Sequence, residues 1–225
     1  MLFRSRQAGF TLVEIAIVLV IIGLLLGGVL KGQEMIENAK IKSIVGDMKA
    51  VQAAYNGYVD RYKAIPGDET VATMTGRGWT GGVAPTGTAG DGVLAITTAQ
   101  TFTNGGGQAA FWSSLRFAGL IAGDPKAPAT QAGLQTHGGG GVIGVTAGPA
   151  YGMPGLLVCA SQVTTKQAAG IDALIDGKGA TNNTGSLRGA RATNTNTLAP
   201  AGPVPATVTT YDETNPFKWT ICMPL

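Results

Sequence analysis

The chain has 225 residues, of which 13% are charged and 35 are glycine, so it carries about half the usual share of charge and roughly twice the usual share of glycine. This composition excludes a highly charged disordered chain and predicts a loop-rich body that contains β-strands. The net charge is +3, two of the basic residues lie in the first nine positions, and no basic stripe is visible. The charge therefore gives no argument for nucleic-acid binding.

A short basic segment opens the chain, and a long apolar run follows it. Residues 1–9 contain two arginines, and residues 10–30 are apolar except for Thr11 and Glu14. As a helix this run measures about 32 Å, the thickness of the hydrocarbon core of a bilayer. Because the arginines precede the run, we expect the N-terminus to face the cytoplasm and the rest of the chain to be exported.

Two ordinary explanations of this run compete with a specialised one. A removable signal peptide has an apolar region of about 7–15 residues followed by a small-residue cleavage site, whereas this run is longer and Gly27-Gly28 matches such a site poorly. A plain signal anchor explains the length but not Glu14, because a carboxylate costs about 2.5–3.5 kcal/mol at the centre of a spanning helix. Glu14 lies near one end, where it partly escapes to the interface, so the plain anchor stays an alternative.

The residues around Glu14 carry a more specific pattern. Gly9 and Phe10 begin the run Gly-Phe-Thr-Leu-Val-Glu, which ends at Glu14 and continues as Ile-Ala-Ile-Val. This run resembles the processing signal of the type IV pilin and pseudopilin superfamily. In that family a membrane aspartic peptidase cuts after the glycine and N-methylates the new first residue. The resemblance implies a cut between Gly9 and Phe10, an N-methylated Phe10, and Glu14 as the family's glutamate, the fifth residue of the mature chain.

The proposed role of Glu14 also has a physical argument. The cut creates a charged amine on Phe10, and a charge is costly in an apolar environment unless it is paired. The Glu14 carboxylate of a neighbouring subunit supplies the opposite charge, and a close pair costs less to bury than two isolated charges. We therefore expect Glu14 to set the axial register of stacked helices.

Further along the chain, an apolar stripe extends the predicted helix to residue 62. Its members recur at alternating spacings of three and four, which is typical of one helix face: Ile41, Ile44, Met48, Val51, Tyr55, Tyr58 and Tyr62. The run Ile-Pro-Gly-Asp at 65–68 predicts the end of the helix. We expect lipid or sister helices around residues 10–30 and a globular head against the amphipathic residues 31–65, with the tyrosines as core anchors.

The remaining residues, 66–225, predict a β-rich head. Short apolar segments alternate with glycine-rich turns, and three prolines, Pro200, Pro203 and Pro205, mark an extended connection. The expected helices are 108–117 and 164–175, and the expected strands are 141–146, 156–159, 186–190, 207–211 and 219–223. The predicted fold class is α+β: a long N-terminal helix, transmembrane in its first half, packed on a C-terminal antiparallel sheet as in pilins.

The two cysteines, Cys159 and Cys222, allow a redox pair, a metal site or a structural disulfide. They are too far apart in the sequence for a redox motif, and the chain has a single histidine to complete a metal site. The spacing favours a structural disulfide, worth about 4 kcal/mol for so long a loop. Such a disulfide indicates an oxidising compartment, the periplasm or the cell exterior.

Other polar residues give only weak indications of a metal site or of catalysis. Asp172 and Asp176, with Asn182 and Asn183, offer oxygen ligands to calcium, but their spacing matches no EF-hand, which favours a solvated turn. His137 has no nucleophile motif or acidic partner identifiable from the sequence, which argues against catalysis through it. We therefore expect no enzyme activity, no metal site and no cofactor.

The resemblance implies a structural subunit of a type IV pilus, which acts in adhesion, twitching motility and DNA uptake. It implies a leader at residues 1–9, a single-pass precursor in the bacterial inner membrane, and a later filament that spans the periplasm or leaves the cell. The implied partners are further copies of the chain, minor pilins, the prepilin peptidase and methyltransferase, the inner-membrane assembly platform and membrane lipid.

Several alternatives stay open. Within the superfamily they are a type II secretion pseudopilin and a minor pilin. Outside it they are a membrane-anchored periplasmic enzyme, for which the sequence shows no catalytic constellation, and an adhesive or nucleic-acid-binding tip protein, which the near-neutral head supports weakly.

Overall fold

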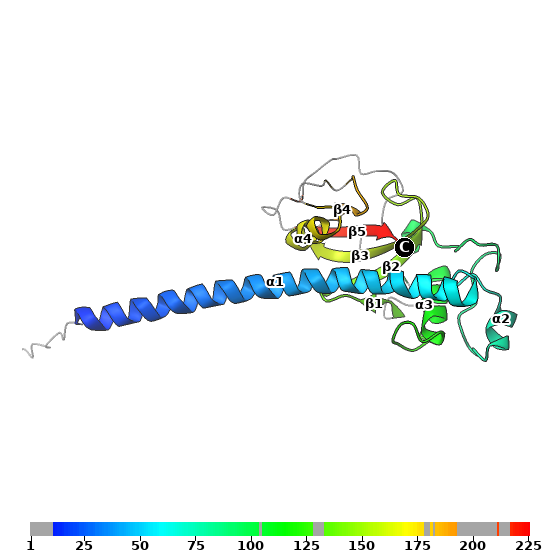
Figure 1. Ribbon diagram of the computed structural model, residues 1–225, viewed down its shortest axis with the longest axis horizontal. Coiled ribbons are helices and arrows are strands. Elements are labelled where there is room, and N and C mark those ends of the chain that lie inside the picture. The colour runs from blue at the N-terminus through cyan, green and yellow to red at the C-terminus, as the bar shows by residue number, and fades with distance from the viewer. Residues whose placement is uncertain are drawn as a thin grey trace, which may run out of the picture. The chain divides into compact units, whose positions relative to one another are not determined.

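The computed structural model divides the chain into two compact units, Met1–Ala39 and Lys40–Leu225. We call the second the head unit. The boundary falls within α1. The described residues are 11–103, 105–127, 133–177, 181, 183–192, 211 and 217–225. The elements, labelled in Figure 1, are α1 (Leu12–Tyr62), α2 (Val71–Gly76), η1 (Thr98–Gln100), α3 (Gly107–Phe117), β1 (Gln135–Thr136), β2 (Val142–Ala147), β3 (Leu156–Thr164), α4 (Thr165–Ile175), β4 (Arg188–Ala192) and β5 (Lys218–Pro224).

The first unit contains the apolar part of α1. The most apolar 18-residue window of this helix has a mean hydropathy of 2.8, and none of it is buried. Its large side chains are exposed, and Leu12 and Leu24 are 91% and 73% exposed. By length and composition α1 is able to cross a membrane, and it is the one helix among the described residues that meets this test.

A five-stranded sheet forms the centre of the head unit. Its strand order is β1-β2-β3-β5-β4, and every neighbouring pair is antiparallel. The last strand of the chain, β5, therefore lies between β3 and β4. This insertion places Cys222 directly opposite Cys159 on β3, and the two are joined as a disulfide.

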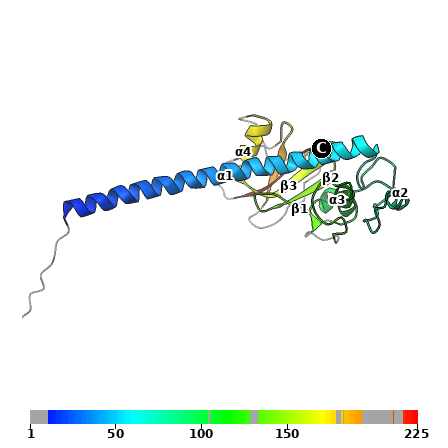
Figure 2. The same ribbon diagram turned by 60° about the horizontal axis from the view of Figure 1, so that its bottom comes forward.

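The part of α1 that belongs to the head unit packs on this sheet (Figures 1 and 2). The buried residues of the helix are Ile41, Ile44, Val45, Met48, Val51, Ala54 and Tyr58. Tyr55 and Tyr62 are half-buried against the same core. The predicted stripe is therefore confirmed as the core-facing side of the helix, and its tyrosines are core anchors.

Most predicted elements of the head occur close to their expected positions. The helix α4 follows Thr164, whose hydroxyl accepts the Gln167 backbone N–H at 3.2 Å while the Gln167 side-chain oxygen accepts the Thr164 N–H at 3.0 Å. This is a reciprocal capping box. The strand β3 continues five residues beyond its predicted end, because pairing with β5 resumes after an irregularity between Ala160 and Val163. The predicted α+β layout is confirmed.

The predicted strand at 186–190 began too early. The backbone N–H groups of Ser186 and Leu187 donate to the Asp176 carboxylate, so β4 starts at Arg188. The prediction missed α2, η1 and β1, which have six, three and two residues and are too short for a periodic signal. The predicted strand at 207–211, except for its last residue, and the proline-marked connection lie outside the described residues.

Candidate processing and assembly site

Glu14 takes part in the cap that begins α1. Its Oε2 accepts the Thr11 backbone N–H and the Thr11 hydroxyl, both at 2.8 Å, while the Glu14 backbone N–H donates to Thr11 Oγ1 at 3.3 Å. This is a capping box, with threonine at the N-cap and glutamate three residues later. The Glu14 carboxylate also lies at the positive end of the helix dipole, which favours a negative charge there.

The capping box explains how an acidic group is accommodated at the start of an apolar helix. A buried or lipid-facing carboxylate is costly when it lacks hydrogen bonds, and Thr11 supplies two of them. A carboxylate has about four lone-pair positions, so Glu14 has room for a further donor while it keeps its bonds to Thr11. The geometry thus permits an ion pair with an amine from outside the helix.

Gly9 and Phe10, the residues of the predicted cut, lie outside the described residues. The cut between them and the N-methylation of Phe10 stay predictions, as does the register role of Glu14. In the sequence Phe10 directly precedes the capping residue Thr11, so a new N-terminus at Phe10 leaves the capping box complete.

The predicted disulfide is present in the head unit. Cys159 and Cys222 are both fully buried, and each belongs to a central strand of the sheet. The bond joins the middle of the head sequence to its last strand.

Asp172 and Asp176, the calcium candidates, have different surroundings. The Asp176 carboxylate accepts the Ser186 and Leu187 backbone N–H groups at 2.9 and 2.7 Å, which ties the end of α4 to the start of β4. Asp172 is only 3% exposed, so the turn is not solvated at this residue, and its Oδ1 has no hydrogen-bond partner among the described residues. No group of three or more His, Cys, Asp or Glu residues suited to a metal occurs in the described part of the chain, and Asn182 lies outside it.

The Asp172 carboxyl should make the stability of the head depend on pH. Burial, together with the nearby charge of Asp176, raises the pKa of Asp172 from 3.8 to about 6. Because the pKa is raised on folding, the carboxyl stabilises the fold fully below pH 3.8 and loses this effect as pH rises through about 6. We expect Asp172→Asn to stabilise the head by about 2 kcal/mol at pH 7 and to have little effect near pH 4.

Urea unfolding of the full chain in detergent micelles measures the free energy of unfolding at pH 4 and pH 7 and so tests this expectation. The fluorescence of the buried Trp112 and Trp219 follows the head. Asp124→Asn, which changes an exposed carboxylate, is the control. An equal effect of Asp172→Asn at pH 4 and pH 7 would show that the buried charge is not the cause.

His137 has a structural environment. It is 4% exposed, its Nε2 lies 2.8 Å from the Ser161 carbonyl oxygen, and its Nδ1 accepts the Gly139 N–H at 3.1 Å. These partners fix a neutral imidazole with the proton on Nε2, and burial lowers the pKa of His137. The Nδ1 bond holds the turn between β1 and β2, and the Nε2 bond ties this turn to β3.

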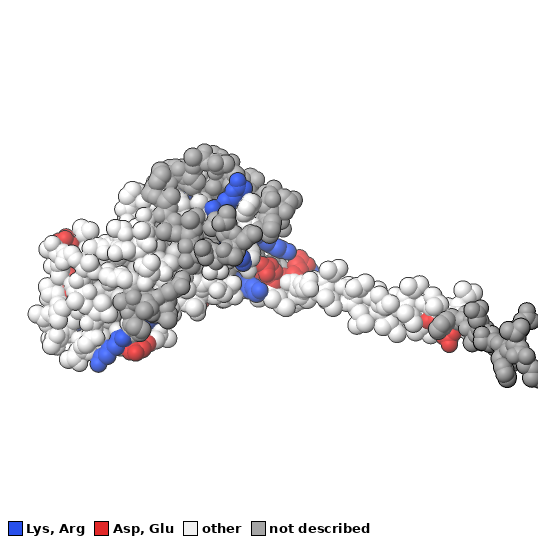
Figure 3. Space-filling view, turned by 180° about the vertical axis from the view of Figure 1, so that it is seen from behind, with Lys and Arg blue, Asp and Glu red and all other residues white. Residues whose placement is uncertain are grey.

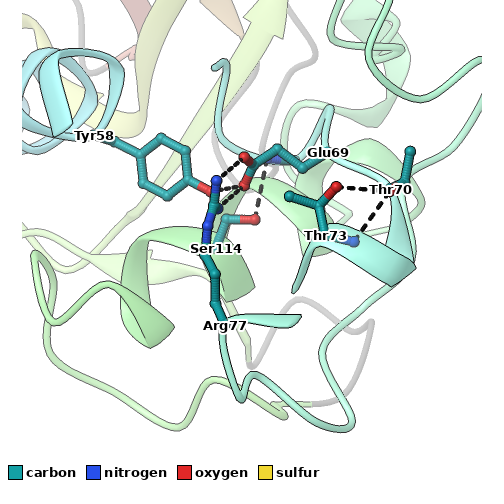
Figure 4. Close-up of polar contacts among 7 residues, drawn as sticks. Tyr58, Glu69, Thr70, Thr73, Arg77 and Ser114 are labelled. Atoms are coloured by element: carbon teal, nitrogen blue, oxygen red, sulfur yellow. Dashed lines mark hydrogen bonds and ion pairs between the residues drawn. The ribbon is translucent and has the colours of Figure 1, made fainter. Parts of the chain in front are cut away.

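A buried polar network at the end of α1 was not predicted (Figure 4). Glu69 is 6% exposed, and its carboxylate accepts hydrogen bonds from the Tyr58 hydroxyl and from both terminal nitrogens of Arg77. The Arg77 guanidinium also lies 4.3 Å from the ring centre of Tyr62. The groups satisfy one another, so the network fixes the loop after α1 to the helix. The sequence places these residues at no regular spacing, and no motif indicates them.

Removal of Arg77 should destabilise the head strongly. Arg77→Met keeps much of the side chain's volume but leaves the Glu69 carboxylate buried without its cation, and breaking such a pair costs about 3 kcal/mol. The measurement is urea unfolding of the full chain in micelles. The matched control is Lys63→Met, because the Lys63–Asp60 pair is 77% and 88% exposed and such pairs contribute little. Equal stability of the two variants would contradict a stabilising role for the network.

Comparison with known proteins identifies one match. The prokaryotic N-terminal methylation motif matches residues 4–30, a stretch that contains Gly9, Phe10 and Glu14. No curated protein and no solved structure matches the chain. Residues 4–30 are the signal of type IV pilins and pseudopilins, and the chain joins this signal to a pilin-like α+β layout, a long N-terminal helix followed by a five-stranded antiparallel sheet.

Proposed function

We propose that this chain is the structural subunit of a type IV pilus, which serves adhesion, twitching motility or DNA uptake. The observation that carries the proposal is the methylation motif at residues 4–30 on a helix whose most apolar window is long enough to cross a membrane and is not buried. Proteins of this type are structural rather than enzymatic. The work of extension and retraction comes from partner ATPases.

The exposed apolar surface of α1 requires a second environment. Full burial of a large aliphatic side chain is worth about 1.5–3 kcal/mol, and many such side chains of α1 are half-exposed or more. Lipid covers this surface in the inner-membrane precursor, and sister helices cover it in the filament. The same segment therefore serves as a membrane anchor and as the filament core.

Processing prepares the helix for this exchange. The prepilin peptidase removes residues 1–9 and methylates Phe10, and an inner-membrane platform then adds the subunit to the filament. The Phe10 amine pairs with Glu14 of a neighbouring subunit, whose carboxylate Thr11 already orients. A misaligned helix would leave both charges unpaired in an apolar environment, and this cost selects one register.

A pseudopilin of type II secretion or a minor pilin carries the same kind of signal. The amount and location of the mature chain separate these roles from that of a major pilin. Cells of the native host are sheared, and the protein is quantified in the surface fraction and in membranes. A large share in the sheared fraction supports the pilus subunit. Mature protein confined to membranes would contradict it and assign a pseudopilin or minor role.

A further inference from the structure

We propose that the end of the head unit at which α1 enters it is a basic surface that binds anionic lipid headgroups. We call this end the entry pole, and we define it by four residues: Lys42, Lys166, Arg191 and Lys218. The inference rests on the proposed membrane anchorage of the precursor. It adds a second membrane contact, made by the head itself.

Contacts between α1 and the rest of the head unit show which end of the sheet lies at the entry pole. A Cβ added at Gly170 on α4 would meet the Ile41 side chain at 2.6 Å, so α4 packs beside the first turn of α1 in the head unit. At the other end of the sheet, the Gln52 side chain donates to the Pro224 carbonyl oxygen at 3.2 Å. The strand β5 therefore starts beside α4 at the entry pole and ends near Gln52.

Three strand and helix ends bring basic residues together at this pole. Lys218 begins β5 and lies opposite Thr164, the last residue of β3. Lys166 follows in the first turn of α4. Arg191, near the end of β4, has its guanidinium 4.8 Å from the ring centre of Phe217, the residue before Lys218. The positive end of the α4 dipole adds to the same field.

The basic side chains of the pole are available to solvent. Lys42, Lys166 and Arg191 are exposed, and Lys218 is half-buried. On the face that Figure 3 shows, basic and acidic side chains lie near one another on the head.

Asp47, five residues after Lys42 on α1, is an acidic residue of the head unit whose carboxylate is already engaged. The Asp47 carboxylate accepts the Gly138 backbone N–H at 3.1 Å and lies 3.4 Å from the Ser43 hydroxyl. Asp212 and Glu213 precede β5 in the sequence and lie outside the described residues.

The sequence tethers Lys42 a short way from the apolar run. Lys42 follows Leu30, the end of that run, by twelve residues, and twelve helical residues measure about 18 Å. Headgroups extend about 5–8 Å beyond the hydrocarbon core, and charges act over about 10 Å at 0.1 M salt. Long lysine and arginine side chains bridge the remaining gap.

Lipid is the occupant that this position favours. Each Lys or Arg near an anionic surface strengthens binding about fivefold at low salt, and four of them at the tethered end of a head add to one another. The pole then holds the head against the membrane while the subunit is stored, and it releases the surface when the helix leaves the bilayer.

The test is lysine footprinting of the full chain in nanodiscs. A neutral acetylating reagent is applied in zwitterionic discs and in discs with about one-third anionic lipid, and mass spectrometry gives the rate for each lysine. We expect acetylation of Lys42, Lys166 and Lys218 to slow at least about threefold in anionic discs at low salt and to recover at high salt. Lys49 and Lys126, exposed residues away from the pole, should keep their rates.

Paired variants separate binding by the pole from mere proximity to the membrane. In Lys42→Gln/Lys166→Gln the protection of Lys218 should be lost, whereas in Lys49→Gln/Lys126→Gln it should persist. Equal rates in both kinds of disc, or protection of Lys218 that survives the first double variant, would overturn the proposal. Protection by duplex DNA in zwitterionic discs with none from anionic lipid would also overturn it. Failure of the chain to co-purify with discs would instead contradict the membrane anchorage.

Discussion

Glu14→Ala is expected to abolish filament assembly while the precursor is still made, inserted and cut. The variant removes the carboxylate that pairs with the Phe10 amine of the neighbouring subunit, and leaving one member of a buried pair alone costs about 3–5 kcal/mol. The yield of sheared filaments should fall at least about a hundredfold. The measurement compares the protein in sheared and membrane fractions of the native host.

Glu14→Gln separates the charge from the helix cap. Glutamine also serves at the third position of a capping box, so it keeps the acceptor for Thr11 but carries no charge. We expect it to fail in assembly almost as completely as Glu14→Ala. The control is Glu34→Ala, which removes an exposed partner of Lys31 and should assemble normally. Normal filaments from Glu14→Gln would show that the charge does not set the register.

Loss of the disulfide is expected to have the largest effect on the stability of the head. Replacing Cys159 and Cys222 together by alanine releases a cross-link with a sequence separation of 63. The expected loss is about 4 kcal/mol, which corresponds to a fall in Tm of about 10 °C for a chain of this size. Thermal unfolding in micelles, followed by the fluorescence of Trp112 and Trp219, measures it.

The double alanine variant loses the packing of two sulfur atoms as well as the cross-link. Reduction of the unmodified protein breaks the cross-link but keeps both sulfur atoms, so it serves as the control. Dithiothreitol should lower the Tm of the native chain almost to that of the double variant, and it should leave the variant unchanged. A double variant whose Tm lies within about 2 °C of the oxidised protein would contradict the stabilising role, because so small a shift corresponds to less than about 1 kcal/mol.

The features that could be predicted each have a strong local signal. The run from Gly9 to Glu14 is a contiguous motif, and the apolar stripe that ends at Tyr62 has a clear helical period. Thr164 with Gln167 marks the start of α4 by the chemistry of the cap alone. In these cases the residues that decide the structure are neighbours in the sequence.

The features that were missed depend on residues far apart in the sequence. The Asp176 carboxylate accepts the backbone N–H groups of Ser186 and Leu187, so β4 begins only after them. No local sequence pattern predicts these hydrogen bonds. Glu69 is a charged residue in a loop, and such a residue is expected to be exposed. It is buried instead, and Tyr58 and Arg77 donate hydrogen bonds to its carboxylate. The capping role of Thr11 has a local signature, the threonine–glutamate spacing of three, but the same residues belong to the processing motif, from which only the cut and the register role of Glu14 were expected.

The first residue of the mature chain separates a processed pilin-like subunit from a plain signal-anchored protein. Intact mass and N-terminal sequencing are applied to the protein from native membranes and from sheared surface fractions. We expect a chain that starts at an N-methylated Phe10 and lacks residues 1–9. A chain that starts at Met1 in a host with an active prepilin peptidase would contradict it and leave a plain signal-anchored protein.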